Sequence, residues 1–261
     1  MYKPFDLVLF LVIVTVISII WGRINRIGYS KLITSIVHFI MKYSRMNAEL
    51  TRSYLVWSIY ILAGLVASLA LLLTYRVNLP RFLTLDRGYF IVIPLAFIAQ
   101  NSLTGLMMQL LILAKGTNVF AEVARIPWVN YTLMMPGVMR VISPLVAAVC
   151  EEVFFRGAVF LVLINHFPQT GVYVPILVCT ALFALQQVLQ TDTFGQAMIL
   201  VIGSASISTV GCITMLYTGS FLPTLLCHAA YAFFYLRLTP SMPRSTATTQ
   251  RSKPSSAYPD F

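Results

Sequence analysis

The chain has 261 residues, of which 59% are hydrophobic and only 10% are charged, and its mean hydropathy is +0.84. Soluble domains carry about 25% charged residues, so the composition excludes an ordinary soluble domain and predicts a multi-pass integral membrane protein. The formal net charge is +10. A basic balance is also typical of nucleic-acid-binding proteins, but orientation of the chain in a membrane accounts for it, and we expect no nucleic-acid partner.

Several apolar segments approach or exceed the roughly 20 residues that a helix needs to cross a bilayer. Because a backbone in lipid must satisfy its own hydrogen bonds, we expect an all-α, polytopic transmembrane helix bundle with about seven to eight spans. A further apolar run, 32–41, is short, and we interpret it as a surface helix or half of a re-entrant pair. The first helix is long for a signal peptide, so we expect it to be retained. The predicted spans are 5–21, 54–75, 89–114, 138–163, 173–189, 197–216 and 221–236.

Basic residues are concentrated between the first two predicted spans. Such a density favours a cytosolic loop under the positive-inside bias. With seven spans the basic residues of the C-terminal tail fall on the same side, whereas Arg76, Arg81 and Arg87 lie on the other side and count against this topology. The cations of the first loop are Arg23, Arg26, Lys31, Lys42, Arg45 and Arg52.

Composition divides the chain into three parts. Residues 1–115 are N-terminal transmembrane helices without a motif that we can interpret, and residues 116–238 carry the charged motifs described below. Residues 239–261, rich in Ser, Thr, Pro and basic residues, are predicted to be a disordered basic tail. The cysteines all fall inside predicted spans, which favours a packing role over disulfides; they are Cys150, Cys179, Cys212 and Cys227.

Glu151, Glu152 and Arg156 place charges in the middle of an otherwise uncharged apolar stretch. Burying an ionised side chain in a bilayer costs about 2.5–3.5 kcal/mol, so such residues indicate a functional site that faces protein or trapped water. Glu152 and Arg156 stand at i and i+4 on a helix, in the favourable ion-pair orientation. A buried pair that only fixes helix packing is the alternative, but it leaves Glu151 unexplained. A second carboxylate is what a general base or a metal ligand supplies.

His228 lies well inside the last predicted span. A histidine there is a candidate for acid–base chemistry or metal binding, and the alternative is a neutral imidazole bonded to a neighbouring helix. Of the other histidines, His166 is expected at an interface and His38 on a solvated face. We therefore expect Glu151 and His228 to meet in one cavity, either as catalytic groups or as metal ligands.

The run Glu151-Glu152-x-x-x-Arg156-Gly157 resembles the first motif of the CPBP family, intramembrane proteases that include the CAAX-processing enzymes and the bacteriocin-processing and Abi proteins. Residues 211–223, with a Thr-Gly-Ser turn and a following His228, are similar to the small-residue helix, turn and last histidine of that family. The resemblance covers roughly residues 126–234 and implies that 116–238 is an intramembrane protease core.

Two positions depart from the family pattern. The middle motif, Phe-x-x-x-His, corresponds to Phe183 and Gln187, so a glutamine stands where the histidine belongs. The last motif, His-x-x-x-Asn or Asp, corresponds to His228 and Ala232. A glutamine amide is a weak neutral ligand and cannot act as a base near pH 7, and Ala232 cannot hold an oxyanion or a metal. The chain is therefore interpreted as a degenerate member.

The resemblance implies a CAAX-type intramembrane endopeptidase that cleaves membrane-associated or prenylated peptides. In this interpretation Glu151 activates water, Glu152 and Arg156 form a supporting pair, and Gln187 positions the water. His228 polarises the scissile carbonyl or binds zinc together with Glu151, and zinc is the only cofactor implied. We expect these five side chains to converge on one cavity within the bilayer.

Two other functions remain open. One is a catalytically silent family member that acts as a membrane binding or scaffold subunit. The other is a transporter or channel, which has no support from internal repeats or paired discontinuous helices. The expected surroundings are the lipid bilayer, in the plasma membrane of a bacterium or the endoplasmic reticulum of a eukaryote. The sequence leaves the oligomeric state and the substrate open.

Overall fold

The structure, a computed structural model, describes residues 4–78, 82–84, 86–116 and 118–238. Within these ranges the chain is helical and contains no strand, as the all-α prediction requires. The tail 239–261, predicted to be disordered, lies outside the described residues.

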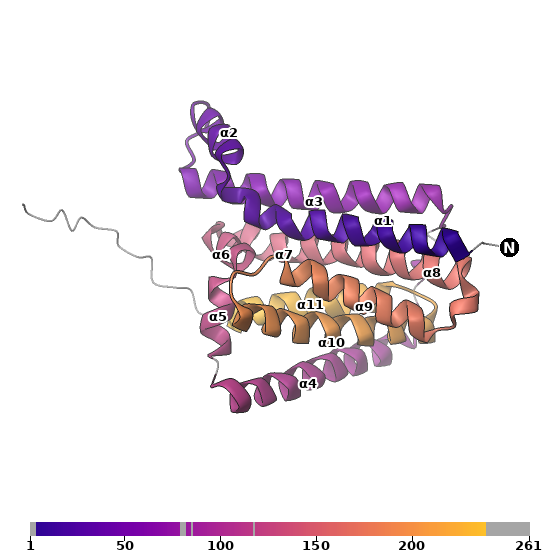
Figure 1. Cartoon of the computed structure of the whole chain (residues 1–261). Helices are drawn as coiled ribbons and strands as arrows, with labels where there is room; N and C mark the ends of the chain where they lie inside the picture. The colour runs from indigo at the N-terminus through magenta and orange to yellow at the C-terminus, as the bar shows by residue number, and fades with distance from the viewer. Residues whose placement is uncertain (1–3, 79–81, 85, 117, 239–261) are drawn as a thin grey trace, which may run out of the picture.

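The long helices follow the predicted spans and lie side by side along one axis (Figure 1). The span predicted at 138–163 is one continuous helical segment with a π-helical stretch in its middle: α7 (Gly137–Glu152), η3 (Val153–Phe160) and α8 (Leu161–His166). The other long elements are α1 (Pro4–Arg23), α3 (Ala48–Thr74), α4 (Tyr89–Lys115), α9 (Tyr173–Val188), α10 (Phe194–Thr218) and α11 (Leu222–Leu238).

Several of these helices are long and apolar enough to span a membrane. In the part of the chain that the structure describes, length and composition identify 4 such segments: Phe5–Tyr29, Ala48–Thr74, Tyr89–Lys115 and Phe194–Thr218. Leu113 on α4 is 81% exposed, and many other large apolar side chains on α1, α3 and α4 also point outward. An apolar exterior around buried polar groups is the pattern expected of a helix bundle in lipid.

Short elements gather at one end of the bundle, on the left of Figure 1. Among them, α2 projects from the bundle, and its buried side chains Ile33 and Val37 pack into the hydrophobic core. Its 11 residues are too few to cross a bilayer, so α2 fits the surface-helix interpretation of 32–41. The elements at this end are η1 (Ile24–Tyr29), α2 (Lys31–Met41), α5 (Val119–Arg125) and α6 (Pro127–Met134), while η4 (Pro168–Thr170) lies at the other end.

Local sequence signals set where several helices begin and end. The Asn47 side chain accepts a hydrogen bond from the Leu50 amide at 2.8 Å and caps α3, which begins earlier than the predicted span. Thr193 caps α10 in the same way. Gly219 follows α10 with a φ of 66°, a left-handed conformation that ends a helix at little cost for glycine. The predicted Thr-Gly-Ser turn therefore joins α10 to α11.

The apolar core is centred where α1, α3, α9 and η3 meet. The Trp21 ring lies 5.3 Å from the Phe154 ring and 6.0 Å from the Phe155 ring, and Phe155 lies 4.9 Å from Phe183. A Cβ at Gly64 would lie 2.9 Å from Trp21 Cε2, so the glycine lets the indole reach the surface of α3. This aromatic core supports the charged residues of α7 and η3 from one side.

Candidate functional site

Three separate helical segments bring the predicted site residues together. Glu151 and Glu152 end α7, and Arg156 follows in η3. Gln187 lies near the end of α9, and His228 lies in α11. All five side chains are buried, with Glu152 and Arg156 at 0% exposure. Glu151, Glu152 and Arg156 flank or lie in the π-helical stretch η3, and π-helical segments inside α-helices are frequent at functional sites.

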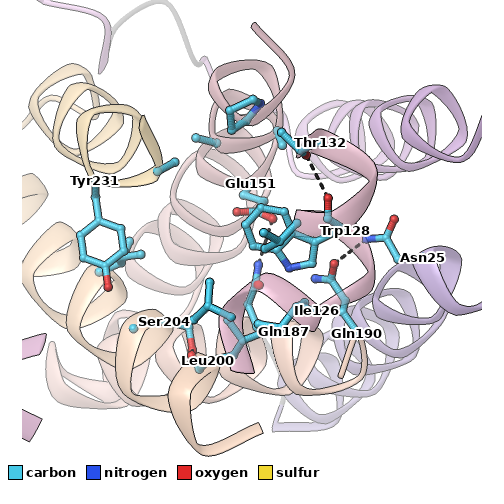
Figure 2. A pocket seen from close by; sticks show the side chains of 18 of the residues that line it. Asn25, Ile126, Trp128, Thr132, Glu151, Gln187, Gln190, Leu200, Ser204 and Tyr231 are labelled. Carbon is cyan, nitrogen blue, oxygen red and sulfur yellow. Dashed lines mark hydrogen bonds between the residues drawn. The ribbon is translucent and has the colours of Figure 1, made fainter. Parts of the chain in front are cut away.

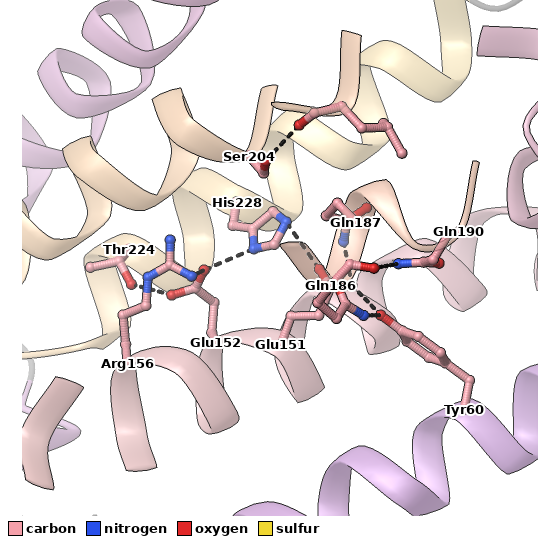
Figure 3. Close-up of polar contacts among 11 residues, drawn as sticks. Tyr60, Glu151, Glu152, Arg156, Gln186, Gln187, Gln190, Ser204, Thr224 and His228 are labelled. Carbon is pink, nitrogen blue, oxygen red and sulfur yellow. Dashed lines mark hydrogen bonds and ion pairs between the residues drawn. The ribbon is translucent and has the colours of Figure 1, made fainter. Parts of the chain in front are cut away.

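Glu152 is the centre of a buried polar cluster (Figure 3). Its Oε1 atom lies 3.1 Å from Nη1 of Arg156 and 2.8 Å from Nδ1 of His228. Its Oε2 atom accepts a hydrogen bond from the Thr224 hydroxyl at 2.7 Å. The ion pair predicted from the i, i+4 spacing is therefore present. Its carboxylate also bonds the His228 imidazole, which the sequence did not predict.

Gly211 begins the segment 211–223, and the structure shows why a small residue stands there. A Cβ at this position would lie 3.3 Å from both Nε and Nη2 of Arg156, closer than an ordinary van der Waals contact. The guanidinium also lies 5.2 Å from the centre of the Phe183 ring, within the range of a cation–π interaction. The small residue on α10 thus makes room for the arginine that neutralises Glu152.

Glu151 makes a different set of contacts. Its Oε1 atom accepts hydrogen bonds from the Tyr60 hydroxyl and from Nε2 of Gln187, the latter at 3.0 Å. Its Oε2 atom lies 3.6 Å from Nε2 of His228. The imidazole is therefore placed between two carboxylates, with Glu152 at Nδ1 and Glu151 at Nε2. Such an arrangement can take up and release a proton at Nε2 while the other nitrogen is held in place.

An apolar cavity of about 160 Å³ adjoins the Glu151 side of this cluster (Figure 2). Glu151, Gln187 and His228 line it, and so does Ala232. Glu152 and Arg156 do not, so the expectation that all five site residues face one cavity was wrong for these two. Glu152 is turned about 100° from Glu151 on the helix and faces α11 instead.

The rest of the cavity wall is mostly aromatic and aliphatic. It includes Trp57 of α3, Trp128 of α6, and Leu200 and Ile207 of α10. Both α5 and α6 contribute side chains, so they cover the cavity at the end of the bundle where the short elements gather. A ligand with apolar substituents fits such a lining better than a polar metabolite does.

The donors in this cluster do not fit a catalytic zinc ion, which usually has three protein ligands and an open position. One nitrogen of His228 already bonds Glu152, and Glu152 itself neutralises Arg156. The atoms left to bind a metal are His228 Nε2 and Glu151 Oε2, since Gln187 offers only a neutral amide, and these two are fewer than the three required. Within the described ranges, no group of three or more His, Cys, Asp or Glu side chains could hold a metal ion.

Two polar partners were missed by the sequence interpretation. Thr224 stands at i−4 from His228 and so shares its face of α11, a spacing that could have pointed to it. Nothing in the sequence pointed to Tyr60, which comes from the N-terminal helices. The remaining histidines lie elsewhere: His38 is exposed on α2, and the His166 ring packs edge-on against Tyr75, with the ring centres 5.5 Å apart.

Comparison with known proteins places most of this site within one family. A family model described as "Family of unknown function (DUF5968)" matches residues 88–236, more than half of the chain. The matched region contains α7 to α10 and most of α11, but not Tyr60. No curated protein and no solved structure matches the chain. The chain belongs to the family of unknown function DUF5968.

Proposed function

We propose that the protein is a CAAX-type intramembrane endopeptidase that cleaves membrane-associated or prenylated peptides and uses Glu151 as its general base. The observation that carries the proposal is the 3.6 Å separation between Glu151 Oε2 and His228 Nε2 at the wall of an apolar cavity. A carboxylate and an imidazole at this distance can both reach one water molecule, as acid–base catalysis requires. The resemblance of the α7 and α10–α11 motifs to the CPBP proteases supports the same reaction class.

The proposed reaction needs only residues of this chain. Glu151 takes a proton from water, and the resulting hydroxide adds to the scissile carbonyl. His228 polarises the carbonyl through its Nε2–H group and then gives that proton to the leaving amine, and the proton held by Glu151 returns to Nε2. Glu152 stabilises the positive imidazole from the Nδ1 side, as the acidic residue of a Ser-His-Asp triad does. Arg156 keeps Glu152 charged and fixed.

A catalytically silent binding subunit is the second candidate, and Gln187 is the observation that favours it. Its amide donates to Glu151 at 3.0 Å but cannot accept the proton of an attacking water. Ala232 offers no donor to an oxyanion. In this case the same cavity would bind an apolar peptide without cleaving it.

The membrane arrangement that we propose has seven crossings: α1, α3, α4, the α7–α8 segment, α9, α10 and α11. The connection from α1 to α3, which contains α2, then lies on the same side of the membrane as the connection from α4 to α7, which contains α5 and α6. This end carries Arg26, Arg45 and Arg125 among its cations, so it faces the cytosol under the positive-inside bias. Protease protection of terminal tags tests the topology: the N-terminal tag should lie outside and the C-terminal tag inside.

The test of activity is cleavage of a prenylated CAAX peptide by the purified protein in proteoliposomes. We expect product from the wild type and a rate reduced by roughly 10²- to 10⁴-fold in Glu151→Gln, which removes the base at little steric cost. Binding of the peptide without any product would favour the silent subunit. Cleavage that persists undiminished in Glu151→Gln would sink the assigned mechanism.

A further inference from the structure

The N-terminal helices contact Glu151 through the side chain of Tyr60. Tyr60 of α3 is 4% exposed, lines the cavity, and donates its hydroxyl proton to Oε1 of Glu151. This residue lies outside the region that the family model matches, 88–236. A part of the chain with no motif of its own therefore contacts the residue to which the chemistry is assigned.

Neighbouring side chains leave the Tyr60 hydroxyl little freedom to turn (Figure 3). Gln186 of α9 donates from Nε2 to this oxygen at 2.7 Å, and the Trp21 ring of α1 lies 5.0 Å from the phenol ring. Trp21 also donates from Nε1 to the backbone carbonyl of Tyr60 at 2.9 Å. A hydroxyl that accepts from Gln186 has one proton to donate, and Glu151 receives it.

The hydrogen bond from Tyr60 helps to orient the Glu151 carboxylate. Tyr60 and Gln187 both donate to Oε1, so the carboxylate is held by one oxygen while Oε2 faces His228 at 3.6 Å. The two donors come from different helices, α3 and α9, on the same side of the carboxylate. Hydrogen bonds to a charged group are among the stronger ones in proteins, so losing one should let Oε2 move away from the imidazole.

We propose that Tyr60 is a positioning residue that holds Glu151 with Oε2 directed at His228, and that α1 and α3 are thereby part of the site. The kinetic side of this inference rests on the proposed endopeptidase function. The contact itself does not, because the hydrogen bond to the Glu151 carboxylate can be observed without turnover.

The experiment uses the full chain in lipid nanodiscs and the variants Tyr60→Phe, Gln186→Leu and Tyr54→Phe. The infrared difference between each protein and its Glu151→Gln counterpart isolates the carboxylate bands of Glu151. We expect these bands to shift in Tyr60→Phe, to shift less in Gln186→Leu, and to stay unchanged in Tyr54→Phe, which alters the same helix away from the site. With a prenylated peptide, kcat should fall by about 10- to 100-fold in Tyr60→Phe with KM unchanged.

Each outcome decides the proposal. Unchanged carboxylate bands in Tyr60→Phe would overturn it, whatever the activity. Shifted bands with an unchanged kcat in an active protein would show that Tyr60 touches Glu151 without positioning it, and would overturn it too. A purely structural role predicts a lower unfolding temperature with normal kcat. If the wild type cleaves nothing, the endopeptidase function fails, and the positioning role stands or falls on the infrared bands alone.

Discussion

Nδ1 of His228 lies 2.8 Å from Oε1 of Glu152, while Nε2 of the same ring lies 3.6 Å from Oε2 of Glu151. Adjacent residues on a helix point about 100° apart, yet a single imidazole on α11 reaches both carboxylates of α7. The ring can do this because it lies between the two side chains rather than in front of either. The site thus separates into a structural half around Glu152 and a reactive half that faces the cavity at Glu151.

The structural half predicts a large loss of stability in Arg156→Ala. The change leaves Glu152 as a buried acid without its cation, and breaking a buried ion pair typically costs about 3–5 kcal/mol. Thermal unfolding in detergent measures the loss. Arg125→Ala is the matched control: its pair with Glu122 is 3.6 Å long and Arg125 is 64% exposed, so the expected cost is below about 1 kcal/mol.

Replacing both partners should be milder than replacing one. Glu152→Leu combined with Arg156→Met removes both charges and should recover part of the stability that Arg156→Ala loses. Thr224 and His228 also lose a partner in the double variant, so recovery should stay incomplete. Equal unfolding temperatures for the wild type and Arg156→Ala would show that the pair contributes nothing to the fold.

Thr224→Val is predicted to lower stability through one hydrogen bond. The substitution keeps the shape of the side chain but removes the donor that lies 2.7 Å from Glu152 Oε2. The expected cost is about 1–3 kcal/mol, because the acceptor is a buried charge. In the control Thr15→Val, the lost hydroxyl bonds only the Leu11 carbonyl one turn earlier, and denaturation curves should show a smaller change.

The sequence predicted the helices of the bundle and the Glu152–Arg156 pair well, since both follow from local patterns: long apolar runs and an i, i+4 spacing. It also placed Glu151, Gln187 and His228 in one cavity, because the resemblance ordered their segments. It did not predict the contacts of Tyr60, because these depend on how α3 packs against α7 and on the hydrogen bond from Gln186 of α9. It did not predict the separate roles of Glu151 and Glu152 either, because these depend on how α11 packs beside α7.

Close packing of α1 on α3 makes Gly64 a sensitive position. A Cβ there would lie 2.9 Å from Cε2 of the buried Trp21 ring, so Gly64→Ala should cost about 1–3 kcal/mol through overpacking. Gly105 on α4 is the matched control, because a Cβ there would meet nothing within 4 Å. Gly105→Ala should be neutral or stabilising, since alanine favours a helix over glycine. Equal unfolding temperatures for the two variants would contradict the α1–α3 packing.

The reactive half predicts a gain of activity when the two missing groups are restored. Gln187 lies 3.0 Å from Glu151, so an imidazole in Gln187→His reaches the same carboxylate and can accept the proton that an amide cannot. Ala232 lines the cavity one turn beyond His228, and Ala232→Asn supplies a donor for the developing oxyanion.

The double variant should cleave a prenylated peptide at least about tenfold faster than the wild type, a conservative share of what a general base contributes. Two controls make the result specific. Gln190→His places an imidazole in the turn that follows α9, where Asn25 Nδ2 donates to the wild-type amide oxygen at 2.5 Å, and should give no gain. Adding Glu151→Gln to the double variant should remove the gain, because the pair needs its carboxylate. A folded double variant with no more activity than the wild type would mean that the cavity is shaped for binding rather than for peptide cleavage.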